Sequence, residues 1–153
     1  MTTCHQNWLG AAGNPTIRLL SHAGKHTVAV DFDETIATKA KYPDAGEPYE
    51  WVAEALRTLM DMGLEVRIYT CRLNGKKMRE GKEAYDADKR IVEDYLEKWG
   101  IPYDSIVPWS DGKPLACYYV DDKGVRFNGD WKATVELIRQ FEALKARKKG
   151  QSS

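Results

Sequence analysis

The sequence predicts an α/β fold built on a mostly parallel sheet. Short apolar runs rich in Val and Ile alternate with longer segments of helical period, and turn residues separate them. This alternation is typical of parallel strands joined by right-handed helical crossovers. The expected strands end at Asp31 or span 64–69, 105–107 and 116–120, with a short edge strand at 125–127. The expected helices begin near Trp51, Ala84 and Trp131.

The composition describes one globular domain with no strong charge preference. The chain has 153 residues, 42% of them hydrophobic, with Lys+Arg and Asp+Glu both at 23. Neutral charge gives no electrostatic reason for a membrane surface and does not indicate nucleic acid, although it does not exclude it. No apolar run approaches the ~20 residues that span a bilayer. Three cysteines without a Cys-x-x-Cys pair favour a reducing cytoplasm, and nothing predicts the oligomeric state.

Three segments are expected along the chain. Residues 1–25 show no sustained period and form an N-terminal arm, loosely ordered in this interpretation. Residues 26–146 are expected to form the folded domain that carries the functional site, and the basic residues 147–153 a flexible tail. Within the domain, 37–48 and 73–81 are expected as loops over the ends of the strands, where substrate-selecting segments commonly lie.

The chain is organised around the segment TVAVDFDET, in which a buried-type strand ends in Asp31 and Asp33. Side chains alternate along an extended chain, so both carboxylates can point the same way. Two neighbouring negative charges are unfavourable without a nearby cation, and Mg²⁺ prefers oxygen ligands of this kind. An acidic turn that closes a strand is the plainer alternative.

Further polar residues follow the other expected strands. They are Thr70, Lys113, Asp121 and Asp122. Because parallel strands bring their carboxyl ends to one edge of the sheet, these groups can converge with the first two carboxylates. Carboxylates with a lysine and a threonine suit the binding of phosphate and a metal, and a carboxylate can attack phosphorus as a nucleophile.

These residues resemble, in order, the four motifs of the haloacid dehalogenase-like (HAD) phosphohydrolases, over residues 27–130. The resemblance implies a three-layer sandwich around a mostly parallel, Rossmann-like sheet. It also implies a phosphatase that requires Mg²⁺ and acts on a small or tethered phosphorylated substrate. Neither 37–49 nor 73–82 is long enough for the cap domain of larger members, so the chain resembles small phage and bacterial members with a minimal cap.

The resemblance also implies a role for each residue. Asp31 is similar to the nucleophile that becomes phosphorylated. Asp33 is similar to the general acid and base, whose backbone carbonyl also binds the metal. Thr70 and Lys113 resemble the groups that hold the phosphoryl group. Asp121 resembles the direct metal ligand, assisted by Asp122. Arg72, two residues after Thr70, is our own addition as a phosphate or substrate contact, with a surface salt bridge as the equally weighted alternative.

Other interpretations of the same residues remain open. A metal-dependent nuclease or nucleic-acid end-processing enzyme also uses carboxylates on strands, although the chain lacks a basic stripe interleaved with aromatics. A catalytically silent binding module of the same fold is also compatible with the sequence. A phosphorylation-switch receiver fits less well, because the adjacent acidic pair here follows the last core strand and no middle strand ends in Asp.

Overall fold

The structure is a computed structural model that describes residues 26–150. The chain divides into two compact units, one up to Asp122 and one from Lys123. The expected N-terminal arm and the last three residues of the expected tail lie outside the described residues. Between residues 26 and 150, no helix is both long and apolar enough to cross a membrane.

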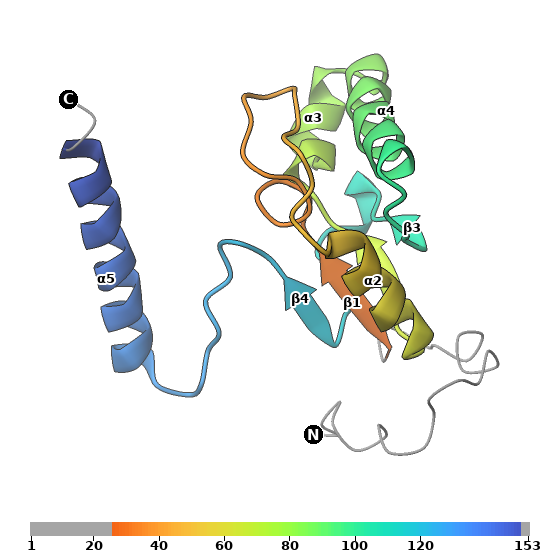
Figure 1. Cartoon of the computed structure of the whole chain (residues 1–153). Coiled ribbons are helices and arrows are strands. Elements are labelled where there is room, and N and C mark those ends of the chain that lie inside the picture. Colours follow the sequence, from red (N-terminus) through yellow and green to blue (C-terminus); the bar gives the residue numbers. More distant parts are fainter. Residues whose placement is uncertain (1–25, 151–153) are drawn as a thin grey trace. The chain divides into compact units, whose positions relative to one another are not determined.

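The first unit contains a four-stranded sheet in the order β3-β2-β1-β4, in which every pair is parallel (Figure 1). Its strands are β1 (Thr27–Val30), β2 (Glu65–Ile68), β3 (Ser105–Ile106) and β4 (Tyr118–Val120). The central strand β1 is buried along its whole length, as its unbroken apolar character predicts. The predicted α/β fold with a parallel sheet is therefore confirmed.

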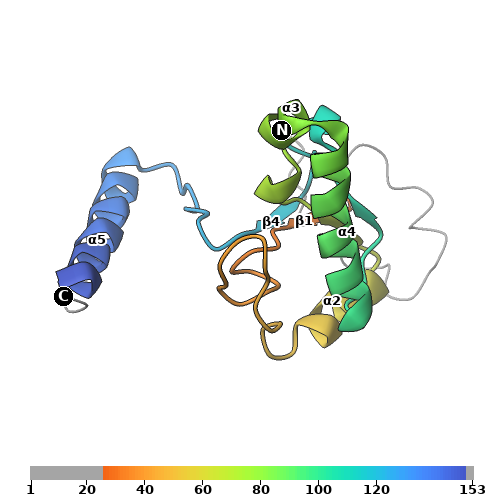
Figure 2. The same ribbon diagram turned by 90° about the horizontal axis from the view of Figure 1, so that it is seen from above.

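One face of this sheet carries the hydrophobic core. Alternate residues of β1 and β2 lie in register, Val28 opposite Val66 and Val30 opposite Ile68, and all four are at most 2% exposed. Helices α2 (Val52–Asp61) and α4 (Lys82–Lys98) contribute to the same apolar cluster. Both helices therefore cover one face, as two successive right-handed crossovers require, and Figure 2 shows them from above.

The segment 73–81 differs from the sequence expectation. In place of a loop, it belongs to a 3₁₀ turn η1 (Cys71–Leu73) followed by α3 (Gly75–Glu80). Side chains cap the start of both elements. The Thr70 hydroxyl accepts a hydrogen bond from the backbone amide of Arg72, and the Asn74 side-chain oxygen accepts one from the backbone amide of Lys77. The caps satisfy amide groups at each start, which offsets the poor helix propensity of Gly75.

The second unit, considered alone, contains the expected terminal helix, α5 (Trp131–Gly150). Asp130 caps it as predicted, because its carboxylate accepts hydrogen bonds from Lys132 and Ala133. Residues 147–150, expected in the tail, continue this helix. The edge strand predicted at 125–127 is wrong: the segment is irregular, and the Phe127 ring lies 4.9 Å from that of Trp131 in place of pairing in a sheet.

Candidate active site

Three carboxylates meet at the carboxyl edge of the sheet. Asp31 directly follows β1, and Asp121 and Asp122 follow the neighbouring β4. The two strands are in register, with Val30 opposite Val120, and the Asp31 amide donates to the Val120 carbonyl at 2.9 Å. Each of the three carboxylates offers an oxygen within 4.8 Å of the others. Parallel pairing therefore brings together residues that the sequence separates by 90 positions or more.

Asp31 lies in an environment that opposes its negative charge. Burial raises its pKa from the usual 3.8 to about 6, and the charges of Asp121, Asp122 and Asp33 add to this effect. The amide of Phe32, which donates to Asp31 Oδ1 at 2.7 Å, partly counteracts the rise. Ionised Asp31 is thus incompletely compensated by the protein alone.

This donor set fits a hard divalent cation. Mg²⁺ takes oxygen ligands and is usually held by one or two carboxylates, with water and substrate phosphate completing its octahedron. Asp31, Asp121 and Asp122 supply such oxygens. A cation between them would offset the unfavourable burial of the Asp31 charge and the repulsion from its neighbours, which together raise the pKa of Asp31. Asp33, the fourth expected metal residue, is expected to bind through its backbone carbonyl, and a cluster of side-chain oxygens does not test that expectation.

Two threonines stabilise the edge that bears the cluster. The Thr35 hydroxyl accepts a hydrogen bond of 3.1 Å from the Asp122 amide, which joins the loop after β1 to the loop after β4. Thr35 is the last residue of the segment TVAVDFDET, but its pattern in the sequence predicts no particular role for it. Thr70 is 4% exposed at the end of β2, and its hydroxyl caps η1. The same hydroxyl can donate its O–H to a phosphoryl oxygen, because the Arg72 amide uses only an acceptor position of the oxygen.

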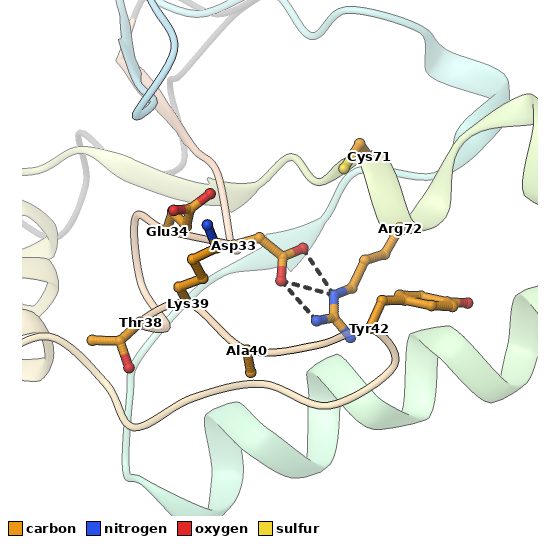
Figure 3. A pocket seen from close by; sticks show the side chains of 8 residues that line it. All are labelled: Asp33, Glu34, Thr38, Lys39, Ala40, Tyr42, Cys71 and Arg72. Carbon is orange, nitrogen blue, oxygen red and sulfur yellow. Dashed lines mark hydrogen bonds and ion pairs between the residues drawn. The ribbon is translucent and has the colours of Figure 1, made fainter. Parts of the chain in front are cut away.

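Asp33 and Arg72 form a close ion pair, drawn in Figure 3. The Arg72 Nε atom lies 2.8 Å and 3.1 Å from the two carboxylate oxygens of Asp33, and Nη2 lies 2.7 Å from Oδ1. Burial alone would lower the pKa of Arg72, but the hydrogen bond and charge of Asp33 outweigh burial and raise it. The structure therefore directs Arg72 to a carboxylate of the segment 31–35, the first of the four motifs.

The segment 37–48 is held in place beside this pair. The Tyr42 hydroxyl donates to both carboxylate oxygens of Asp88 on α4, at 2.9 Å and 3.0 Å, and Lys77 contacts the same phenol. Tyr95 of α4 donates to the carbonyl of Gly46 at 2.7 Å. No sequence signal pointed to Tyr42, because one aromatic residue in a Lys- and Pro-rich loop has no distinctive pattern.

A cavity of about 330 Å³ opens between this loop and η1. Figure 3 shows Asp33 and Arg72 on its wall together with loop residues. The remaining lining residues are Glu34, Thr38, Lys39, Ala40, Tyr42 and Cys71. Its volume is at the lower end of the range for small-molecule sites, and it lies directly beside one carboxylate of the first motif.

Lys113, an expected site residue, contacts an aromatic ring in this structure. It is exposed, and its ammonium lies 4.5 Å from the centroid of the Tyr119 ring. Among residues 26–150, Lys113 forms no ion pair with Asp31. The expectation of a cation beside the nucleophile is therefore not met in this conformation.

Comparison with known proteins gives no function. No family model and no curated protein matches the chain. A conserved protein from Bacteroides thetaiotaomicron is similar at 24% identity and a TM-score of 0.47, over 74% of this chain and 89% of that one. A protein from Vibrio cholerae is similar at 25% identity and a TM-score of 0.41, over 74% of this chain and 97% of that one. Likeness at these TM-scores indicates neither activity nor substrate.

Proposed function

We propose that the protein is a Mg²⁺-dependent phosphomonoester hydrolase of the HAD type that acts through a phosphorylated Asp31. The observation that carries the proposal is the meeting of Asp31, Asp121 and Asp122, whose oxygens lie within 4.8 Å at the carboxyl edge of a parallel sheet. Ligands of open α/β sheets bind at this edge. The bound Mg²⁺ would neutralise charge on the nucleophile and on the phosphoryl oxygens.

The chain's own residues supply the two chemical steps. An Asp31 oxygen forms a bond to phosphorus as the bond from phosphorus to the leaving oxygen breaks, and Asp33 gives that oxygen a proton. Asp33 then takes a proton from water as the water oxygen attacks phosphorus. The bond between phosphorus and Asp31 breaks, which releases phosphate and restores the carboxylate. Thr70 holds a phosphoryl oxygen in both steps.

The cavity supports a small leaving group. Asp33 lines it, and a general acid must lie within hydrogen-bond reach of the oxygen that it protonates. The leaving group of a substrate would then occupy the space beside Lys39 and Ala40. Between β1 and α2 the described chain forms the loop 31–51 and no inserted domain, so a larger, tethered substrate can also extend out of the site. We place this activity in the cytoplasm, where the thiols of Cys71 and Cys117 would stay reduced.

Hydrolysis of an aryl phosphate by the metal-stripped protein tests the proposal. We expect turnover only after Mg²⁺ is added, and little with Ca²⁺, whose looser coordination would misplace the attacking carboxylate. Unchanged turnover in excess EDTA would contradict the proposal. Absence of turnover with Mg²⁺ across phosphorylated sugars, nucleotides and oligonucleotide ends would favour the silent binding module.

Variants of the two first-motif carboxylates should fail differently. Asp31→Asn removes the nucleophile, so both turnover and the phosphorylated protein should disappear. Asp33→Asn should slow turnover by ~10²–10⁴-fold, yet an aryl phosphate that needs no protonation should still phosphorylate Asp31, as measured by mass spectrometry. Asp94→Asn, an exposed position on α4, is the matched control and should remain active. A phosphoryl group on any residue other than Asp31 would refute the assignment.

A further inference from the structure

The Arg72 guanidinium is buried and its hydrogen bonds are directed to protein groups. Its side chain is 4% exposed, whereas that of Asp33 is 35% exposed. Arginine has five N–H donors. One from Nε and one from Nη2 go to Asp33, the second from Nη2 goes to the Asp44 carbonyl, and one from Nη1 goes to the Pro43 carbonyl. Four of the five are therefore engaged within the protein.

The ring contacts of Arg72 further restrict its orientation. Its guanidinium carbon lies 5.2 Å from the centroid of the Phe32 ring and 5.5 Å from that of Tyr42. Phe32 is fully buried, and the Tyr42 hydroxyl is held by Asp88. A planar group with two aromatic contacts and four directed hydrogen bonds has one orientation in this structure. Phosphate binding through its forked edge would require Asp33 to leave.

We propose that Arg72 is a positioning residue for Asp33 and does not bind the phosphoryl group. Arg72 donates to both oxygens of the Asp33 carboxylate and, at the same time, to the loop carbonyls of Pro43 and Asp44. It thereby holds the general acid and base against the wall of the cavity. This inference rests on the proposed phosphatase function. It replaces the expectation from the sequence that Arg72 contacts phosphate.

The paired geometry explains why an arginine is suited to this position. Its planar fork can bind a carboxylate through two donors and still reach two carbonyls, whereas a lysine ammonium is a single point of charge with three donors. Arg72→Lys would keep the positive charge but lose the fixed direction of the Asp33 carboxylate. Misplacement of a catalytic group by about 1 Å can cost ~10²-fold in rate.

A double-mutant cycle tests the proposal with the full-length protein and Mg²⁺. Arg72→Lys should lower kcat for an alkyl phosphate by ~10²-fold and should affect an activated aryl phosphate less, because that leaving group needs no proton. The inhibition constant of inorganic phosphate should change by less than about threefold, since ground-state binding is untouched. In an Asp33→Asn background, adding Arg72→Lys should lower kcat by less than about a further threefold, because the effects of mutating residues that act as a unit do not add.

Several outcomes would overturn the inference. An inhibition constant for phosphate that rises about tenfold or more in Arg72→Lys, or rate losses that multiply in the double variant, would show that Arg72 contacts the phosphoryl group. Arg67→Lys, an arginine of β2 that contacts Ser105 and Asp111, is the matched control and should leave kcat unchanged. A wild-type protein without phosphatase activity would instead refute the function on which the inference rests.

A second measurement applies if Arg72→Lys does not fold. In Asp33→Asn, the carbonyls of Pro43 and Asp44 should still hold Arg72, so the inhibition constant of inorganic phosphate should stay within about threefold of wild type. An inhibition constant that is about tenfold or more lower in Asp33→Asn would mean that Arg72 turns to bind phosphate once the charge of Asp33 is removed. That result would refute the positioning role.

Discussion

At the scale of single residues, Lys113 contacts Tyr119 through an exposed cation–π interaction at 4.5 Å, worth about 0.5–1 kcal/mol. A charge-assisted hydrogen bond to a phosphoryl oxygen is worth more, about 1.5–3 kcal/mol. We therefore expect bound substrate to draw the ammonium off the ring. Lys113→Met should then lower kcat by ~10²–10³-fold, the loss typical of a missing electrostatic contact in the transition state, as measured by steady-state kinetics on the folded variant.

Lys98→Met is the matched control for this prediction. Lys98 also lies over an aromatic ring, that of Trp99, at 5.2 Å, but it belongs to the end of α4. Its replacement should leave kcat within about twofold of wild type, as expected for surface positions outside special sites. If Lys113→Met is equally active, the lysine serves only to cover Tyr119.

The carboxylates could be anticipated individually from the sequence, whereas their partners could not. Asp31, Asp121 and Asp122 stand at strand ends, and the rule that parallel strands share a carboxyl edge predicts that they meet. The partner of Arg72 is Asp33, 39 residues away, and the contact depends on how the loop 37–48 folds over both. Side-chain pairing across a loop has no periodicity, so a single sequence gives no signal for it.

At the scale of elements, the loop 37–48 is fixed to α4 through a buried carboxylate. Asp88 is 4% exposed and is bound by the Tyr42 hydroxyl and by Lys77 Nζ at 3.3 Å. Asp88→Ala removes the carboxylate that accepts from the Tyr42 hydroxyl and pairs with Lys77 Nζ. Its loss should lower the free energy of unfolding by about 1–3 kcal/mol. Urea denaturation measures the loss, and faster hydrogen exchange at residues 38–48 should accompany it.

An exposed ion pair on the same helix provides the control. Glu93 contacts Lys89 at 3.1 Å, with side chains 38% and 44% exposed. Exposed pairs at this spacing contribute about 0.3–0.5 kcal/mol, so Glu93→Ala should change stability little and leave exchange in the loop unaltered. Equal effects of the two variants would mean that Asp88 does not anchor the loop.

The helices and strands of the core were predictable because the spacing of apolar residues in the sequence matches the positions that are buried in the structure. The two wrong predictions have local causes. Helix α3 was missed because Gly75 and Gly81 suggested a loop, whereas the Asn74 cap decides the outcome. The predicted strand at 125–127 is bounded by Gly124 and Gly129 and makes an aromatic contact instead. In both cases a side-chain contact overrides a weak local preference.

At the scale of the whole molecule, the acidic cluster couples folding to pH. A carboxyl whose pKa is higher in the folded state than in the unfolded state binds more protons when folded, so stability falls as pH rises between the two values. For Asp31 these values are 3.8 and about 6. The metal-free protein should therefore lose about 1 kcal/mol through this group between about pH 4 and pH 6, after allowance for solvent screening at a partly exposed carboxylate.

Asp31→Asn isolates this contribution, because the amide carries no charge at any of these pH values. In EDTA at pH 7, the variant should melt at a higher temperature than the wild type, and the difference should shrink as pH falls below about 4. Mg²⁺ should reverse the order of the melting temperatures. An ion that binds only the folded state adds about 2.7 kcal/mol to the free energy of unfolding at a hundredfold excess over its Kd, and the variant lacks one of the carboxylates that would bind the ion. Calorimetry of both proteins over this pH range, in EDTA and with Mg²⁺, measures both differences in melting temperature, with Asp94→Asn as the control. A wild type that is already the more stable protein in EDTA at pH 7 would show that the carboxylates are compensated without a cation, which would remove the electrostatic argument for the metal.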